Sequence, residues 1–251
     1  MATKSGIEWT EMTWNPVTGC TKISQGCKNC YANRMALRLK AMGANRYKDG
    51  FAPTIHEDLV DLPKRWRKPR TIFVNSMSDL FHEDISVSFI KRVFATMASC
   101  PQHTFQVLTK RSQRLRDLGR TLDWPANVWM GVSVENSDVV SRVDDLASVP
   151  ARVRFLSCEP LIGPLDNLRL KGIHWVIVGG ESGPGSRPMN AEWVESIQAQ
   201  CEQAEVSFFF KQWGGVRKHR TGRTLNGQVF NAMPPLAAFS VASAELVQIA
   251  C

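Results

Sequence analysis

The feature that most constrains the fold is a pattern that recurs from residue 71 onward, in which a short apolar run ends in polar residues and a helical stretch follows. Six runs have this form: TIFVNSMSD (71–79), TFQVLTKR (104–111), VWMGVSVEN (128–136), VRFLSCEP (153–160), HWVIVGGES (174–182) and VSFFFKQWG (206–214). Each is rich in β-branched and aromatic residues and is bounded by Pro, Gly or polar clusters, which is typical of strands. Helical patterns follow at 86–99, 137–148 and 191–204. Strand alternating with helix predicts a parallel sheet.

One more strand and one more helix are expected before these runs. A strand near 14–18 and a helix over about 29–42 bring the count to six or seven βα units. That count predicts an α/β fold, a partial or complete TIM-type barrel of six to seven parallel strands. An open doubly wound sheet is the alternative, because connectivity alone does not separate the two. The length of 251 residues suits a single barrel domain over 1–235, with a C-terminal tail or short helix over 236–251.

Polar side chains gather at the carboxyl ends of three predicted strands. Because side chains alternate along a strand, three sets are each expected to share one face: Gly131, Ser133 and Glu135; Ser157 and Glu159; and Ile177, Gly179 and Glu181. If that face points inward, three carboxylates converge on the barrel mouth, the end of the barrel at which the strands finish, with Lys110 and Asp79 close by. Any one of these acids alone could equally be a solvated strand end. Three in equivalent positions favour a site.

Three of the seven cysteines form the strongest local signal. Cys20, Cys27 and Cys30 lie within eleven residues, whereas Cys100, Cys158, Cys201 and Cys251 are scattered and are most simply small buried hydrophobic residues. The odd number argues against a disulfide framework. A closed zinc site needs four ligands, and no His occurs before residue 56. Three thiolates with an open coordination position favour an iron–sulfur centre over structural zinc.

The charge balance points to an anionic partner. The chain has 31 Lys and Arg residues against 23 acidic residues, a net charge of +8, and the excess is clustered. Candidates for nucleic-acid contact are Lys64, Arg65, Trp66, Arg67, Lys68, Trp213, Arg217 and Lys218. Taken singly, each cluster could be a solvated face. No apolar run approaches the ~20 residues that span a bilayer, and the N-terminus lacks a signal-peptide stretch, so we expect a cytoplasmic protein without membrane contact.

Several motifs together resemble a known superfamily. A cysteine-rich loop after the first strand, a CxxC followed by an aromatic residue and a later Gly-Gly-Glu are similar to features of radical S-adenosylmethionine (SAM) enzymes. More closely, the chain resembles a phage-encoded and bacterial family of unknown function associated with three-Cys-motif partner proteins. The likeness is carried by WNPVTGC, GCKNCYA, VNSMSDLFH, LTKR, VSVEN, SCEPLIGPL, VGGESGPGSRPM and KQWGG, over roughly residues 5–235. The spacing Cx6CxxC differs from the superfamily's usual Cx3CxxC.

The resemblance implies a radical SAM enzyme acting on a nucleic-acid or nucleotide substrate. It implies a [4Fe–4S] cluster on Cys20, Cys27 and Cys30, with SAM on the fourth iron, an electron donor, and reductive cleavage of SAM to a 5′-deoxyadenosyl radical. The expected SAM contacts are Ser76, Ser78 or Asp79 with the amino group, Lys110 or Arg111 with the methionine carboxylate, Ser133 and Glu135 with the ribose, and the backbone of Gly179 and Gly180 with the adenine. Glu159 and Glu181 are expected at the same mouth, beside cationic or hydroxyl groups of the ligand. The alternative is a non-catalytic nucleic-acid-binding or interaction module with a structural zinc.

Overall fold

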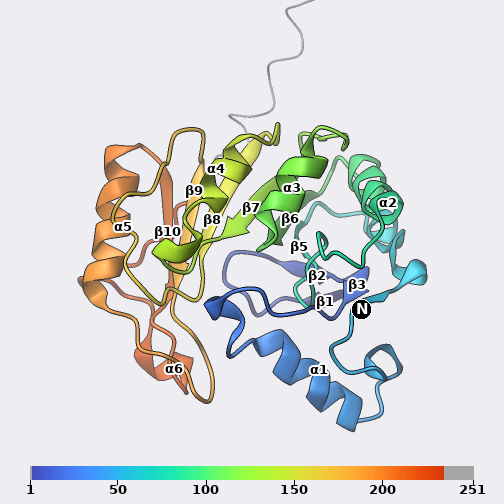
Figure 1. Ribbon diagram of the computed structural model, residues 1–251, viewed down its shortest axis with the longest axis horizontal. Helices are drawn as coiled ribbons and strands as arrows, with labels where there is room; N and C mark the ends of the chain where they lie inside the picture. The colour runs from blue at the N-terminus through green and yellow to red at the C-terminus, as the bar shows by residue number, and fades with distance from the viewer. Residues whose placement is uncertain (1, 235–251) are drawn as a thin grey trace, which may run out of the picture.

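A single curved sheet organises the computed structural model, which describes residues 2–234 (Figure 1). Its strands, in spatial order, are β1 (Ala2–Lys4), β2 (Met12–Trp14), β5 (Thr71–Val74), β6 (Thr104–Thr109), β7 (Val128–Ser133), β8 (Val153–Cys158), β9 (Trp175–Gly179) and β10 (Ser207–Gln212). From β2 to β10 all neighbours are parallel, and β1 is antiparallel to β2. The order does not return from β10 to β1. The seven parallel strands therefore form a partial barrel, as one of the two predicted forms requires.

The curvature of the sheet is visible in the contacts of one ring. The Trp9 ring centroid lies 4.8 Å from that of Phe73 on β5 and 6.1 Å from that of Trp175 on β9. Four strand spacings separate β5 from β9, about 19 Å in a flat sheet. One side chain reaches both strands because the sheet curls around it.

Helices cover the outer, convex face of this sheet. They are α2 (Val87–Ala98), α3 (Ser112–Gly119), α4 (Arg142–Ala147) and α5 (Ala191–Gln203). The amphipathic period explains α2, since Phe89, Ile90, Val93 and Phe94 recur at helical spacing and are all buried. Ser86 caps the start of the helix, where its Oγ accepts a hydrogen bond from Phe89 N at 3.3 Å. By contrast, α1 (Tyr31–Ala41) lies apart from these four, below the sheet in Figure 1.

The concave face has three layers along the strands. At the amino ends lies an aromatic cluster of Trp9, Phe73, Trp129, Phe155, Trp175 and Phe209. Gly131 makes room for it, because a Cβ there would lie 2.4 Å from the Phe155 ring. Above the aromatic layer lie the small residues Ser133, Ser157 and Gly179, followed by charged side chains at the carboxyl ends. The aromatic layer fills the amino end of the barrel, so polar chemistry is confined to the mouth.

The predicted elements are largely confirmed, with four differences. The helix over 29–42 and the six strand runs from residue 71 onward are present, and the antiparallel β1 was not expected. The single strand predicted near 14–18 is divided between β2 in the main sheet and β3 (Val17–Thr18), which pairs with β4 (Thr54–Ile55) in a small second sheet. The predicted helix over 137–148 is divided into the 3-10 turn η5 (Ser137–Val139) and α4. No helix connects β8 to β9 in the described chain. That connection, 159–174, contains Pro160, Gly163, Pro164 and Gly172, which disfavour a helix.

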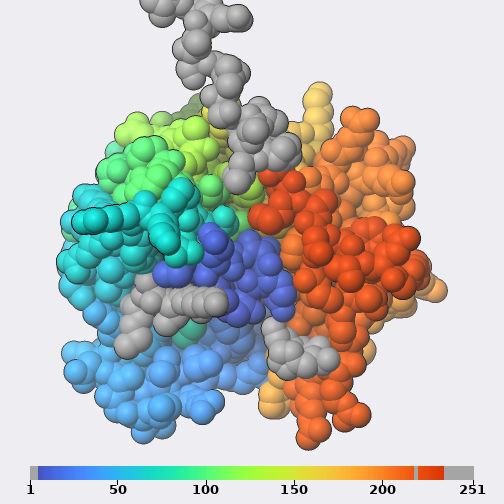
Figure 2. Space-filling model, turned by 180° about the vertical axis from the view of Figure 1, so that it is seen from behind, coloured from blue at the N-terminus to red at the C-terminus, as the bar shows by residue number. Residues whose placement is uncertain are grey.

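The two ends of the described chain meet on the back of the molecule. The blue N-terminal residues lie between the light-blue lobe that follows them and the orange-to-red C-terminal residues (Figure 2). Trp175 Nε1 on β9 donates to Ala232 O at 2.8 Å, which joins the C-terminal segment to the aromatic layer. Between residues 2 and 234 no helix has the length and apolar character to cross a bilayer. The predicted tail over 236–251, with Cys251, lies outside the described residues.

Candidate metal centre

The three clustered cysteines lie on one loop at the carboxyl edge of the sheet, between β3 and α1. All three are free and partly exposed, whereas the other described cysteines, Cys100, Cys158 and Cys201, are buried. The loop starts at a close approach of two backbones. Gly19 has φ +84°, its N donates to Met77 O at 2.9 Å, and a Cβ there would lie 2.1 Å from Ala52 O. Only glycine fits this position.

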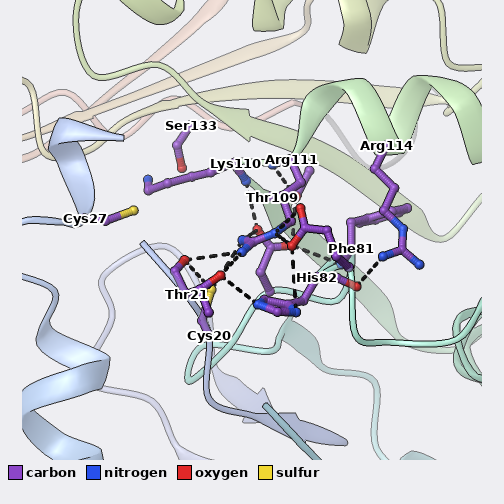
Figure 3. Close-up of polar contacts among 12 residues, drawn as sticks. Cys20, Thr21, Cys27, Phe81, His82, Thr109, Lys110, Arg111, Arg114 and Ser133 are labelled. Carbon is purple, nitrogen blue, oxygen red and sulfur yellow. Dashed lines mark hydrogen bonds and ion pairs between the residues drawn. The ribbon is translucent and has the colours of Figure 1, made fainter. Parts of the chain in front are cut away.

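Cys20, the first cysteine, is held by a buried arginine. Arg111 follows β6, and its Nη1 donates to Cys20 Sγ at 3.3 Å (Figure 3). Burial raises the pKa of the Cys20 thiol to about 11, and Asp79 adds to this effect while Arg111 opposes it. Burial and Asp79 therefore favour the protonated thiol of Cys20, and a metal bound there would displace the proton.

Arg111 also binds the residue that follows Cys20. Its Nη2 donates to Thr21 Oγ1 at 2.9 Å, its Nε donates to Glu83 Oε2 at 2.8 Å, and its Nη1 lies 3.3 Å from Asp79 Oδ2. Asp79 in turn accepts from Thr109 Oγ1 at 2.7 Å and from the backbone N of Lys110 at 3.1 Å. The Asp79 carboxylate is thus occupied by protein donors from β6 and the residues after it.

Glu135, at the end of β7, contacts the middle of the cysteine loop. Its Oε1 accepts from Ser24 Oγ at 3.2 Å, and a Cβ on Gly26 would lie 2.5 Å from its Cγ. Only 1% of Glu135 is exposed, and its carboxylate lies 2.8 Å from Lys110 Nζ and 3.1 Å from Arg142 Nη1. Burial acts to raise the pKa of Glu135, but Lys110 and Arg142 outweigh it and hold that pKa below its ordinary value.

Glu181, after β9, contacts the end of the cysteine loop. Its Oε2 accepts from Asn29 Nδ2 at 2.9 Å, and Arg187 forms a fork with Nη2 at 2.6 Å from Oε1 and Nε at 2.9 Å from Oε2. Burial acts to raise the pKa of Glu181, but the hydrogen bonds from Arg187 and Asn29 outweigh it and lower the pKa to about 2. The loop is therefore attached to the sheet at its start, middle and end by Arg111, Glu135 and Glu181.

Glu159 completes the set of strand-end acids but contacts a different partner. Its Oε1 lies 2.8 Å from Lys211 Nζ on β10, and its Oε2 accepts from Ser157 Oγ at 3.2 Å. The neighbouring glycines are required by packing. A Cβ on Gly179 would lie 2.6 Å from Glu159 Oε1, and a Cβ on Gly180 would lie 2.0 Å from Trp213 O. The three predicted acids do lie at the mouth, and each has a cationic partner from the protein itself.

The two serines after β5 support the segment that leads into the cysteine loop. Ser78 Oγ donates to Val17 O at 2.8 Å, and Ser76 Oγ donates to Asn15 Oδ1 at 3.2 Å. Tyr31, next to Cys30, donates its hydroxyl to Ser76 O. Ser133 lies inside the barrel below Glu135 and is 1% exposed. The predicted SAM contacts of these serines stay predictions.

The predicted nucleic-acid residues lie at both ends of the barrel. Lys64, Arg65, Arg67 and Lys68 are exposed, and they precede β5, which places them at the amino ends of the strands, opposite the cysteines. Trp66 packs on the core with its ring 6.0 Å from that of His103. Trp213 and the exposed Arg217 follow β10 at the mouth, where Trp213 Nε1 donates to Thr224 O at 2.8 Å. The side chain of Lys218 lies outside the described set.

Comparison with known proteins assigns the family. A family model described as "Protein of unknown function (DUF5131)" matches residues 4–234. The chain belongs to the DUF5131 family. No curated protein matches the DUF5131 chain.

Solved structures of spore photoproduct lyase are similar to this DUF5131 chain. A cysteine-to-alanine variant with dinucleoside spore photoproduct has a TM-score of 0.51 at 11% identity, and a tyrosine-to-phenylalanine variant has a TM-score of 0.50 at 11% identity. Each match covers 81% of this chain and 64% of that chain, so the DUF5131 chain spans less than two thirds of the lyase's length. The likeness shows the fold, a radical-SAM-like partial barrel.

Several residues of the DUF5131 site were not predicted. No sequence pattern identifies three partners of the strand-end acids Glu135 and Glu181, which are Arg142, Ser24 and Asn29. Lys211 does carry such a pattern, because it alternates with the inward-facing Phe209 on β10. It lies at a register shift of β10, between Phe210, which pairs with Val178, and Gln212, which pairs with Gly179. The same alternation that predicted the three acids therefore also predicts Lys211.

The three cysteines provide donors that suit an iron–sulfur cluster. Among residues 2–234, no group of three or more His, Cys, Asp or Glu side chains is arranged around one ion. In a [4Fe–4S] cluster each cysteine binds a different iron, so the cysteine sulfurs lie farther apart than the ligands of one ion. Three free, partly exposed thiols on one anchored loop suit that chemistry, and Cys20, Cys27 and Cys30 are the residues that would hold the group.

Proposed function

We propose that this DUF5131 chain is a radical SAM iron–sulfur enzyme that acts on a nucleic-acid or nucleotide substrate. Cys20, Cys27 and Cys30 hold a [4Fe–4S] cluster, with SAM on the fourth iron. The observation that carries the proposal is the contrast among the cysteines: these three are partly exposed on one loop at the carboxyl edge of a radical-SAM-like barrel, and the other described cysteines are buried. When bound, the cluster would pass one electron from an external donor to SAM, which would release methionine and supply a 5′-deoxyadenosyl radical to take a hydrogen atom from the substrate.

The chain's own residues position the loop for this chemistry. Arg111 fixes the start of the loop through Cys20, Glu135 supports its middle through Ser24, and Glu181 binds its end through Asn29. These anchors come from three different strand ends of one sheet, so they set the loop at a fixed height above the barrel. Protein cations neutralise the strand-end acids Glu135, Glu159 and Glu181.

Two observations support a nucleic-acid or nucleotide substrate. The net charge of +8 favours an anionic partner. The similar lyase structure holds a dinucleoside spore photoproduct, a ligand made of nucleosides. An electron donor and a three-Cys-motif partner protein belong to the same proposal, as does a cytoplasmic location.

The experiment is SAM cleavage by the anaerobically reconstituted protein. With dithionite as reductant, the proposal predicts release of 5′-deoxyadenosine and methionine, together with the visible absorption band of a [4Fe–4S] cluster. The Cys27→Ala variant is the matched negative control, and Cys201→Ala is the control for a buried thiol. One tightly held zinc with neither the band nor 5′-deoxyadenosine would instead support a non-catalytic module with a structural zinc.

A further inference from the structure

A cavity of about 870 Å³ lies beneath α1. Its walls come from α1, from the segment over 44–49, from β2 and β3, and from the residues after β5. It adjoins the cysteine loop on two sides. Thr18 in its wall is two residues before Cys20, and Ser76 in its wall accepts the hydroxyl of Tyr31, which follows Cys30. Its volume is in the range of small-molecule binding sites.

One buried amide in this wall lacks a partner for its nitrogen. Asn15 is 8% exposed, and its Oδ1 accepts from Met77 N at 3.0 Å and from Ser76 Oγ at 3.2 Å. The bond from a backbone N–H fixes which atom is the oxygen. No residue in the described part of the chain accepts from Asn15 Nδ2. A ligand in the cavity therefore meets a preoriented donor that calls for a carbonyl oxygen or a ring nitrogen.

Apolar side chains and a further polar pair also line the cavity. Met35 and Leu39 of α1 form one side, and Tyr47 adds an aromatic ring. Thr18 Oγ1 and His56 Nε2 bond to each other at 2.8 Å, and burial lowers the pKa of His56, which keeps the ring neutral near pH 7. A sugar would leave the apolar walls without contacts, and a fatty chain would leave the Asn15 amide unpaired. A planar heteroaromatic base can pack its faces on the apolar side chains and accept a hydrogen bond from Asn15 Nδ2 at its edge.

The rim carries one cation that is not already committed. Arg46 donates to both carboxylate oxygens of Asp58, from Nη2 to Oδ2 at 2.6 Å and from Nη1 to Oδ1 at 3.1 Å. Asp49 is also at the rim. Lys48 is exposed and forms no ion pair within residues 2–234. A phosphate attached to the base would find its counter-charge at Lys48.

We propose that the cavity beneath α1 binds a nucleobase of a nucleotide, with Asn15 Nδ2 donating to the edge of the base and Lys48 beside the phosphate. This inference rests on the proposed function: it specifies a nucleotide as the substrate and the cavity as the place where its base binds. The site adjoins the residues predicted to bind SAM, because Ser76 also lines the cavity, and the base would lie next to the cysteine loop.

The test is equilibrium binding of AMP, GMP, CMP and TMP to the reconstituted protein. At least one is expected to bind saturably, and Leu39→Trp, which fills the cavity, should abolish that binding. Leu37→Trp is the matched control, because Leu37 is on the same helix but 53% exposed and outside the cavity. Asn15→Asp, which keeps the acceptor for Met77 N and removes the donor, should weaken binding about tenfold. Lys48→Ala should weaken binding of the nucleoside monophosphate and leave binding of the matching nucleoside, which has no phosphate, unchanged.

Three outcomes would overturn the assignment: no binding by any of the four at millimolar concentration, binding that survives Leu39→Trp, or displacement of the nucleotide by SAM, which would give the cavity to the cofactor. Iron content and 5′-deoxyadenosine release are measured on the same samples. A protein with cluster and SAM cleavage but without nucleotide binding refutes the cavity assignment alone. Nucleotide binding without SAM cleavage refutes the enzyme and leaves the cavity assignment intact.

Discussion

The guanidinium of Arg111 donates from Nη1 to the sulfur of Cys20 across 3.3 Å, although the two residues are 91 positions apart in the chain. The same guanidinium binds Thr21, Asp79 and Glu83, so one side chain joins the cysteine loop to the ends of β5 and β6. The position of Cys20 is therefore fixed by a contact with the barrel and not by the conformation of the loop alone. It also identifies the residue whose loss should disturb the site most.

Replacing Arg111 with Ala should lower the free energy of unfolding by about 3 kcal/mol, because it leaves the buried Asp79 without its counter-charge. Chemical denaturation of the ligand-free protein measures this. The matched control is Arg92→Ala, which removes an equally close fork to Glu57 on the exposed surface and should leave the midpoint unchanged. Equal losses in the two variants would contradict the anchoring role of Arg111.

Replacing Glu135 with Gln should also destabilise the protein, by about 3 kcal/mol, because Lys110 and the buried Arg142 lose their shared carboxylate. The middle of the cysteine loop rests on Glu135, so the variant should in addition lose iron to a chelator faster than wild type. Glu57→Gln, at an exposed ion pair, serves as the control for charge alone. A variant of normal stability with normal iron retention would show that Glu135 supports neither the fold nor the loop.

Glu181 predicts a pH dependence of stability. Its folded pKa of about 2 lies below the ordinary value of 4.5, so its contribution is complete above pH 4.5 and is lost as the pH falls toward 2. Thermal unfolding of wild type should therefore show a decline between about pH 5 and pH 2 that is shallower in Glu181→Gln. Parallel curves for the two proteins would mean that the Arg187 fork does not hold the carboxylate in the folded state.

Local pattern was sufficient to predict most of the barrel. The strand runs and the α2 and α5 helices follow from apolar periodicity, because each element buries one face against the same sheet. The helix-free connection between β8 and β9 was missed because strand–helix alternation was assumed to continue through residues rich in Pro and Gly. The edge strand β1 was missed because three residues are too few for a period to be recognised.

The sequence indicated which strand-end acids lie at the mouth, but it indicated few of the side chains that they contact. Alternation placed Glu135, Glu159 and Glu181 at the mouth and can also place Lys211 there, but the contact of Arg142 with Glu135 is set by the packing of α4. The basic cluster over 64–68 was predicted from its charge alone, without a place in the fold. Its place just before β5 already indicated the opposite end of the barrel.

The basic cluster makes a separate prediction about nucleic acid. Replacing Lys64, Arg65, Arg67 and Lys68 with Ala should weaken binding of a single-stranded oligonucleotide and reduce the log–log salt slope by about 0.7 per lost phosphate contact. Fluorescence anisotropy over a range of NaCl concentrations measures the slope. The control replaces Lys91 and Lys171, two exposed lysines outside the cluster. A slope unchanged from wild type would make the cluster a solvated surface.

Iron content of single cysteine variants tests the central claim most directly. After anaerobic reconstitution, wild type, Cys100→Ala and Cys201→Ala should each retain about four irons per chain, while Cys20→Ala, Cys27→Ala and Cys30→Ala should each lose the cluster. The claim depends on the exposed loop position of these three and the burial of the others. Wild-type iron in Cys27→Ala, or loss of iron in Cys201→Ala with its fold intact, would contradict the assignment.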